Sequence, residues 1–177
     1  MRALRRLLTF IASRLLALTI VFSLLVISFY LAMNTANIWV LIDEGLDLRA
    51  GVVLTGSKED DLTKYFSQEF LNQDPVLQVV RGGNSPYVDY DVRSYDHRIR
   101  VNSIWSWPWE TVARADITEN IPSIEGSIKS AKREAALAAG GESRLKPPAW
   151  ESARYRVTLV RSAGRWKITN MQVIQQK

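Results

Sequence analysis

"LLALTIVFSLLVISFYLAM", Leu15 to Met33, dictates the architecture of this chain. It is the densest part of a run without Asp, Glu, Lys or Arg that extends from Leu15 to Ile42. About 20 apolar residues suffice for a helix to cross the hydrocarbon core of a bilayer. A buried helix of a soluble protein rarely runs so far without a charge. The sequence therefore predicts a transmembrane helix, which we place at residues 15–36.

The flanks of this segment predict its orientation. A basic arm, residues 1–14, precedes the segment, and the first acid of the chain is Asp43. Basic residues favour the cytoplasmic side of a membrane. A signal peptide would end in two small residues with one residue between them, but Asn34 interrupts that pattern around Ala32 and Ala36. We therefore expect an uncleaved anchor in the cell membrane, with a cytoplasmic N-terminus and an extracytoplasmic C-terminal domain. The arginines that set this topology are Arg2, Arg5, Arg6 and Arg14.

Charge and composition exclude several classes of function. Four of the 23 Lys and Arg residues lie in the arm, and the other 19 nearly balance 18 Asp and Glu residues, so the net charge of +5 is no nucleic-acid footprint. The chain has no cysteine, which excludes disulfides, thiol catalysis and thiolate metal sites. A glycine-rich phosphate loop, metal-ligand spacing and a nucleophile elbow are also missing from the sequence. We therefore predict no cofactor, no metal site and no nucleic-acid partner.

Beyond the span, the pattern predicts one α+β domain at residues 57–177. A juxtamembrane helix at 37–56, stopped by Gly56, continues the membrane helix with little or no linker. An amphipathic helix follows at 57–75, with Ser57 as its N-cap. Apolar alternation or short apolar runs then predict strands at 76–80, 87–92, 95–101 and 111–121, with a bulge or turn at Arg93–Ser94.

The C-terminal third is predicted to hold an excursion and a hairpin. Residues 122–148 lose the strand pattern, and their centre, Ile128 to Ala139, is helix-prone but rich in alanine. We expect a mobile excursion with a marginal helix there. Two strands follow, "ESARYRVTLV" from Glu151 and "RWKITNMQVI" from Arg165, joined by a turn that contains Gly164.

These elements resemble the cone-shaped family of nuclear transport factor two, which includes ketosteroid isomerases. The resemblance covers roughly Leu41 to Ile174 and rests on N-terminal helices, an antiparallel sheet and the ending "YRVTLVRSAGRWKITNMQVI". It implies helices packed on a curved antiparallel sheet. The single anchor before such a domain is similar to bitopic inner-membrane assembly factors of type IV secretion and conjugation machines, and related architectures occur in sporulation channel proteins.

Enzymes of that family resemble one another in placing an Asp base, or an Asp–His pair, inside the cone. Three residues of this chain could line such a cavity: His97, Asp116 and Trp105. A lone histidine on a strand is more often packed than catalytic, and Asp116 between Arg114 and Thr118 is explained by an ion pair. These residues therefore predict no catalytic site.

The stretch "SIWSWPWETV", Ser103 to Val112, carries three tryptophans at alternate positions. A proline in mid-strand would remove a hydrogen-bond donor, so a hairpin is predicted, with Trp105 packed on the sheet. Trp107, Pro108 and Trp109 would then form a tip that contacts a partner or the membrane. Two alternatives stay open, since the rings could fold back over the core or form a ligand cage.

The sequence thus predicts a non-catalytic, membrane-anchored structural or assembly component of a bacterial envelope complex. Its expected partners are the membrane, other envelope proteins and a second copy of itself. The alternative is an enzyme or small-ligand binder that uses the cone cavity. An enzyme needs titratable groups that meet in a pocket, whereas a scaffold needs an exposed apolar patch.

Overall fold

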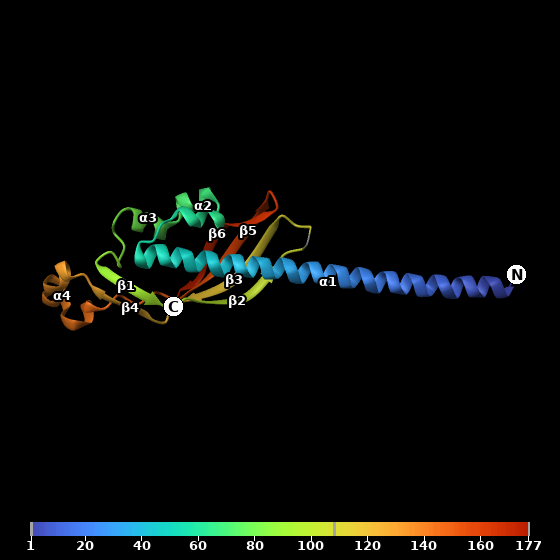
Figure 1. Ribbon diagram of the computed structural model, residues 1–177, viewed down its shortest axis with the longest axis horizontal. Helices are drawn as coiled ribbons and strands as arrows, with labels where there is room; N and C mark the ends of the chain where they lie inside the picture. The colour runs from blue at the N-terminus through green and yellow to red at the C-terminus, as the bar shows by residue number, and fades with distance from the viewer. Residues whose placement is uncertain (1, 108, 177) are drawn as a thin grey trace.

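One long helix organises the molecule. The computed structural model describes residues 2–107 and 109–176, with side chains from residue 10 onward. Helix α1, Arg2–Thr55, is a single α-helix of 54 residues. At about 1.5 Å per residue it is roughly 80 Å long. Its N-terminal half projects alone, and its C-terminal half lies against the strands (Figure 1). The two helices predicted at 15–36 and 37–56 are therefore one helix, which ends where Gly56 adopts φ +67°.

The two halves of α1 differ in what surrounds them. Side chains of the apolar segment from Leu15 to Met33 are exposed in the isolated chain, except for the half-buried Leu31. From Ile38 onward one face is buried, with Ile42, Leu46 and Ala50 at the spacing of successive helical turns. Among the residues described, α1 is the one helix long and apolar enough to cross a membrane.

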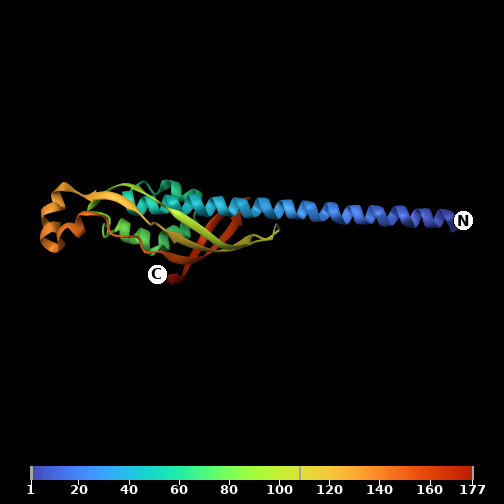
Figure 2. The same ribbon diagram turned by 90° about the horizontal axis from the view of Figure 1, so that it is seen from below.

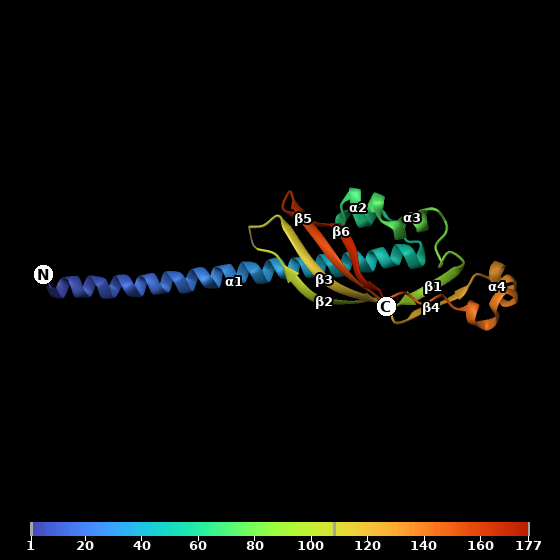
Figure 3. The same ribbon diagram turned by 180° about the vertical axis from the view of Figure 1, so that it is seen from behind.

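A four-stranded antiparallel sheet packs on the C-terminal half of α1 (Figure 3). The strand order is β2-β3-β5-β6. The inner face carries the small and branched residues expected for a sheet covered on one side, including Ala113, Ile117 and Val157. The strands are β2 Arg98–Trp105, β3 Val112–Asn120, β5 Ala153–Ser162 and β6 Arg165–Gln176.

A second, two-stranded sheet pairs β1, Tyr90–Tyr95, with β4, Ile124–Ile128. The register of β1 shifts between Val92 and Ser94, which confirms the predicted irregularity there. The α+β class and the antiparallel strands are also confirmed. Since the described strands divide between two sheets, the cone-like arrangement stays a prediction.

Both predicted hairpins are present. Strands β2 and β3 are joined through residues 106–111, and β5 and β6 through Ala163 and Gly164. These two turn residues have φ +49° and +77°, the left-handed pair that a tight hairpin turn requires.

The predicted helix at 57–75 is wrong as a single element. A short 3₁₀ helix, η1 Asp60–Lys64, is separated from α2, Gln68–Gln73, by a stretch that bonds to β6. Ser67 N–H donates to the carbonyl of Ile168 at 2.9 Å, and Ile168 N–H donates to that of Tyr65 at 2.8 Å. These tertiary bonds break the helical ladder, after which Ser67 caps α2.

The strand predicted at 76–80 is also wrong, because the segment forms helix α3, Pro75–Arg81. The carboxylate of Asp74 accepts the N–H of Val76 at 3.0 Å, and Pro75 occupies the first turn. Asp74 as N-cap and proline in the first turn both favour a helix start. The apolar run "VLQVV" that follows them was mistaken for a strand.

The excursion at 122–148 contains one strand and three short helices. These are β4, η2 Ser130–Lys132, α4 Arg133–Gly140 and η3 Gly141–Leu145. The mobility of this segment stays a prediction. Helix α4 confirms part of the predicted helix-prone centre. It lies at the end of the molecule farthest from the N-terminus (Figure 2).

Candidate functional site

Three tryptophan rings form one exposed cluster at the β2–β3 tip. The rings of Trp107 and Trp109 stack with centroids 5.2 Å apart, and the ring of Trp105 meets that of Trp107 edge-on at 5.6 Å. Trp105 and Trp109 are 66% and 69% exposed, and Trp107 is 36% exposed. An exposed apolar aromatic cluster is typical of an interaction surface.

The hairpin was predicted correctly, but the packing of Trp105 was not. Trp105 pairs across the sheet with Arg114, and paired residues share a face. That face is the outer one, because the inner face of β3 is taken by Ala113 and Ala115. Trp105 therefore joins the exposed cluster instead of the core. Pro108, which the prediction placed in the tip, lies outside the described residues.

One side chain of α1 holds the tip in place. The amide of Asn34 donates from Nδ2 to the hydroxyl of Ser106 at 2.9 Å, and its Oδ1 accepts from Trp166 Nε1 at 3.0 Å. Ser106 is 8% exposed and lies between Trp105 and Trp107 in the chain. The first residue after the apolar segment thus joins α1, the β2–β3 tip and β6. The tryptophan cluster is held at the level of α1 where the apolar segment ends.

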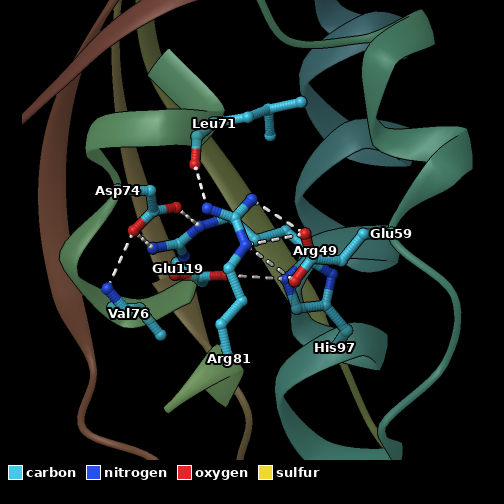
Figure 4. A network of polar contacts seen from close by, with 8 residues as sticks. All are labelled: Arg49, Glu59, Leu71, Asp74, Val76, Arg81, His97 and Glu119. Atoms are coloured by element: carbon cyan, nitrogen blue, oxygen red, sulfur yellow. Dashed lines mark hydrogen bonds and ion pairs between the residues drawn. The ribbon is translucent and has the colours of Figure 1, made fainter. Parts of the chain in front are cut away.

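A buried ion pair fastens α1 to α3 (Figure 4). Arg49 donates from Nε and Nη2 to the two carboxylate oxygens of Asp74, at 2.6 and 3.0 Å. The side chains are 5% and 1% exposed. Because Asp74 also caps α3, one carboxylate serves both the ion pair and the start of the helix. A bidentate geometry of this kind fixes position as well as supplying energy.

A second ion pair encloses the same corner of the molecule. Arg81, at the end of α3, contacts Glu59 with Nη2 and Oε2 2.8 Å apart. Its Nη1 donates to the carbonyl of Leu71 at 3.0 Å. Both ion pairs are drawn in Figure 4. The first pair joins α1 to the start of α3, and the second joins the end of α3 to Glu59, just before η1.

His97 is buried on the inner side of the four-stranded sheet. Its Nε2 lies 3.1 Å from Oε1 of Glu119, and its Nδ1 lies 3.6 Å from Oδ1 of Asp47 on α1. The His97 side chain is 5% exposed and that of Glu119 is fully buried. Glu119 Oε2 has no hydrogen-bond partner among the described residues. His97 therefore lies between Asp47 of α1 and Glu119 of β3, and little of the His97–Glu119 pair is exposed to solvent.

Asp116 lies on the opposite, outer face of the sheet. Arg156 donates to its two oxygens at 2.9 and 3.2 Å, and Arg154 lies 3.6 Å away. The hydrogen bond from Arg156 lowers the pKa of Asp116. The predicted ion pair is present, with Arg156 as the partner in place of Arg114. The structure brings Asp116 and Trp105 to one shallow depression and leaves His97 on the other side of the sheet.

A cavity of about 360 Å³ opens beside Arg49 and was not predicted. Its walls include the apolar Val53 and Val76 and the aromatic rings of Tyr87 and Trp150, which stack with centroids 6.3 Å apart. Burial raises the pKa of Tyr87 to about 12, so its phenol stays neutral. The cavity could hold a small apolar group. No sequence pattern links residues 87 and 150, which meet only through the fold.

No protein-family model, no curated protein and no solved structure shows significant similarity to the chain. The resemblance to the nuclear transport factor two family therefore stays a prediction.

Proposed function

We propose that this chain is a non-catalytic, single-pass membrane protein that serves as a structural or assembly component of a bacterial envelope complex. Helix α1 crosses the membrane with its N-terminus in the cytoplasm, and the domain faces the opposite side. A conjugation, secretion or sporulation channel is the class of complex that the resemblance implies. Other envelope proteins and further copies of this chain are the expected partners.

The observation that carries this proposal is the continuity of α1. The helix that holds the apolar segment enters the domain core without a linker, and Ile38, Ile42 and Leu46 pack there. An unbroken helix fixes both the height and the orientation of the domain above the bilayer. An enzyme that acts on diffusing substrates does not require a fixed height above the bilayer. Subunits of a membrane assembly need matching heights, so a rigid mount favours the assembly role.

The placement of the titratable groups supports the same proposal. A catalytic site needs groups that converge where a substrate can bind. The His97–Glu119 pair is almost entirely buried, and Asp116 is bound by Arg156 on the other face of the sheet. The exposed tryptophan cluster, in contrast, offers a contact surface.

A hinge in α1 tests the proposal. Inserting Gly-Ser-Gly-Ser between Met33 and Asn34 should leave the span and the domain folded, because the insertion lies between the apolar segment and the buried face of α1 that begins at Ile38. The flexible residues would uncouple the orientation of the domain from that of the span. We expect loss of the higher-order complex on native gels and by crosslinking in cells, with unchanged membrane insertion and melting temperature.

The same four residues inserted between Gly140 and Gly141, at the far end of the molecule, provide the matched control. That variant should assemble like the unmodified chain. If the hinge variant assembles equally well, the rigid-mount proposal is wrong.

A further inference from the structure

We propose that the domain binds the bilayer surface through a lipid-binding tip made of Trp105, Trp107, Trp109, Arg161 and Arg165. The tip enters the phospholipid headgroup region of the same membrane that α1 crosses. This inference rests on the proposed function, because it requires α1 to span the bilayer. It adds a second membrane contact to the domain and names lipid as the molecule that covers the exposed tryptophans.

The position of the tip along the membrane normal supports this inference. The apolar segment from Leu15 to Met33 is 19 residues long, about 28 Å of helix, which matches a hydrocarbon core of about 30 Å. The headgroup region adds roughly 5–8 Å on each side. Asn34 is the next residue, and its amide bonds to Ser106 and Trp166. These bonds hold the cluster within the headgroup layer if α1 spans.

The amphipathic character of the tryptophan rings also suits the membrane surface. Tryptophan is enriched at membrane–water interfaces, because its ring is apolar and its N–H is polar. The rings of Trp105 and Trp109 are about two-thirds exposed, at 66% and 69%. Trp39, 44% exposed on α1, lies little more than one helical turn beyond Asn34. Four tryptophans therefore gather near the level at which α1 leaves the apolar segment.

Two arginines, Arg161 and Arg165, lie in the hairpin beside the tryptophan cluster. The N–H of Arg161 donates to the carbonyl of Thr111 at 2.7 Å, which joins the β5–β6 hairpin to the β2–β3 tip. Both turns lie on the side from which the N-terminal half of α1 projects (Figures 1 and 3). Arg161 and Arg165 are exposed, and the Arg161 guanidinium lies 5.9 Å from the Trp166 ring centroid.

Basic side chains beside aromatic rings suit anionic phospholipid headgroups. The acid in the β2–β3 turn is Glu110, and its carboxylate accepts the N–H of Trp107 at 3.0 Å. That carboxylate is thus engaged within the turn. A protein partner would need an apolar surface that also reaches the headgroup level, whereas lipid is already there.

Depth-dependent quenching tests the inference. The chain has no cysteine, so Trp109→Cys provides a unique site for an environment-sensitive fluorophore. The labelled full-length protein is reconstituted into phosphatidylcholine vesicles that contain phosphatidylglycerol, with bromine on the acyl chains near the headgroup. We expect a blue-shifted emission and a loss of intensity at position 109. Arg161→Gln with Arg165→Gln should reduce both effects, and omitting phosphatidylglycerol should do the same.

Two further labels make the result decisive. Ala138→Cys, exposed on α4 at the far end, should show neither the shift nor the quenching. Phe22→Cys, in the apolar segment, should be quenched if α1 spans the bilayer. Quenching at 22 without quenching at 109 would overturn the lipid-binding tip and leave the anchor intact. A tip that crosslinks to another protein, with no lipid quenching, would overturn it in favour of a protein partner. Absence of quenching at 22 would overturn the anchor itself, and the inference with it.

Discussion

Replacing Arg49 with leucine is expected to destabilise the folded domain by about 3–5 kcal/mol, because it leaves the buried carboxylate of Asp74 without its partner. The substitution also removes the contact that fastens α1 to the N-cap of α3. A small domain is stable by only about 5–15 kcal/mol, so the loss is a large fraction of the total. We expect a melting temperature at least roughly 10 °C lower for the full-length chain in detergent micelles.

Arg98→Leu is the matched control for this prediction. Arg98 also forms an ion pair, with Asp96, but the two side chains are 67% and 40% exposed. Exposed pairs contribute about 0–1 kcal/mol, so the melting temperature should change little. Arg49→Lys keeps the charge without the bidentate geometry and should fall between the two. Similar effects for Arg49→Leu and Arg98→Leu would show that the buried pair is not a structural fastening.

Two arginines in the middle of the apolar segment should prevent membrane insertion. Val21→Arg with Leu25→Arg places both charges on one face of α1, near the centre of the segment. Each arginine at the centre of a span costs about 2.5–3.5 kcal/mol on the insertion scale, so the pair costs roughly 5–7. We expect the chain to leave the membrane fraction on alkaline extraction, or to be degraded.

Thr35→Arg with Ala36→Arg provides the control. Both positions are exposed and lie just past the apolar segment, where arginine side chains can reach the headgroups. That variant should remain in the alkaline-resistant membrane fraction. Retention of the Val21→Arg/Leu25→Arg chain in the same fraction would mean that α1 is not a transmembrane helix.

Sequence patterns predicted the elements whose structure depends on neighbouring residues in the chain. The apolar segment, the Gly56 stop, the alternation of β3 and the turn at Gly164 all follow from spacing, burial or backbone conformation within a few residues. The same reasoning failed where distant segments intervene. The hydrogen bonds between β6 and residues Tyr65 and Ser67 break the predicted helix at 57–75. The sequence of that stretch contains no pattern that predicts them.

The residues of the sites were only partly predictable. The tryptophan tip follows from "SIWSWPWETV", but its height is set by Asn34, which lies 72 residues from Ser106 in the chain. The buried polar groups come from different elements: Arg49 from α1, Asp74 from the start of α3, His97 from the β1–β2 connection and Glu119 from β3. Glu119 lies on the inner face of β3, two residues after Ile117, as the alternation of the strand predicts. A buried glutamate there does not by itself indicate which residue it contacts.

We propose that α1 leaves the bilayer at Asn34 and continues into the domain as one rigid helix. Single cysteines at exposed positions of α1 can carry a spin label, since the chain has no cysteine of its own. Suitable sites are Leu25, Phe29, Met33, Asn37 and Val40. The measurement compares relaxation of each label by oxygen, which concentrates in lipid, with relaxation by a water-soluble nickel complex.

We predict that oxygen dominates at residues 25 and 29, that the two effects approach each other near 33, and that nickel dominates at 37 and 40. The change should occur within about one helical turn of Asn34. A change beyond Asp43, or nickel accessibility throughout the segment, would show that α1 does not leave the bilayer at Asn34.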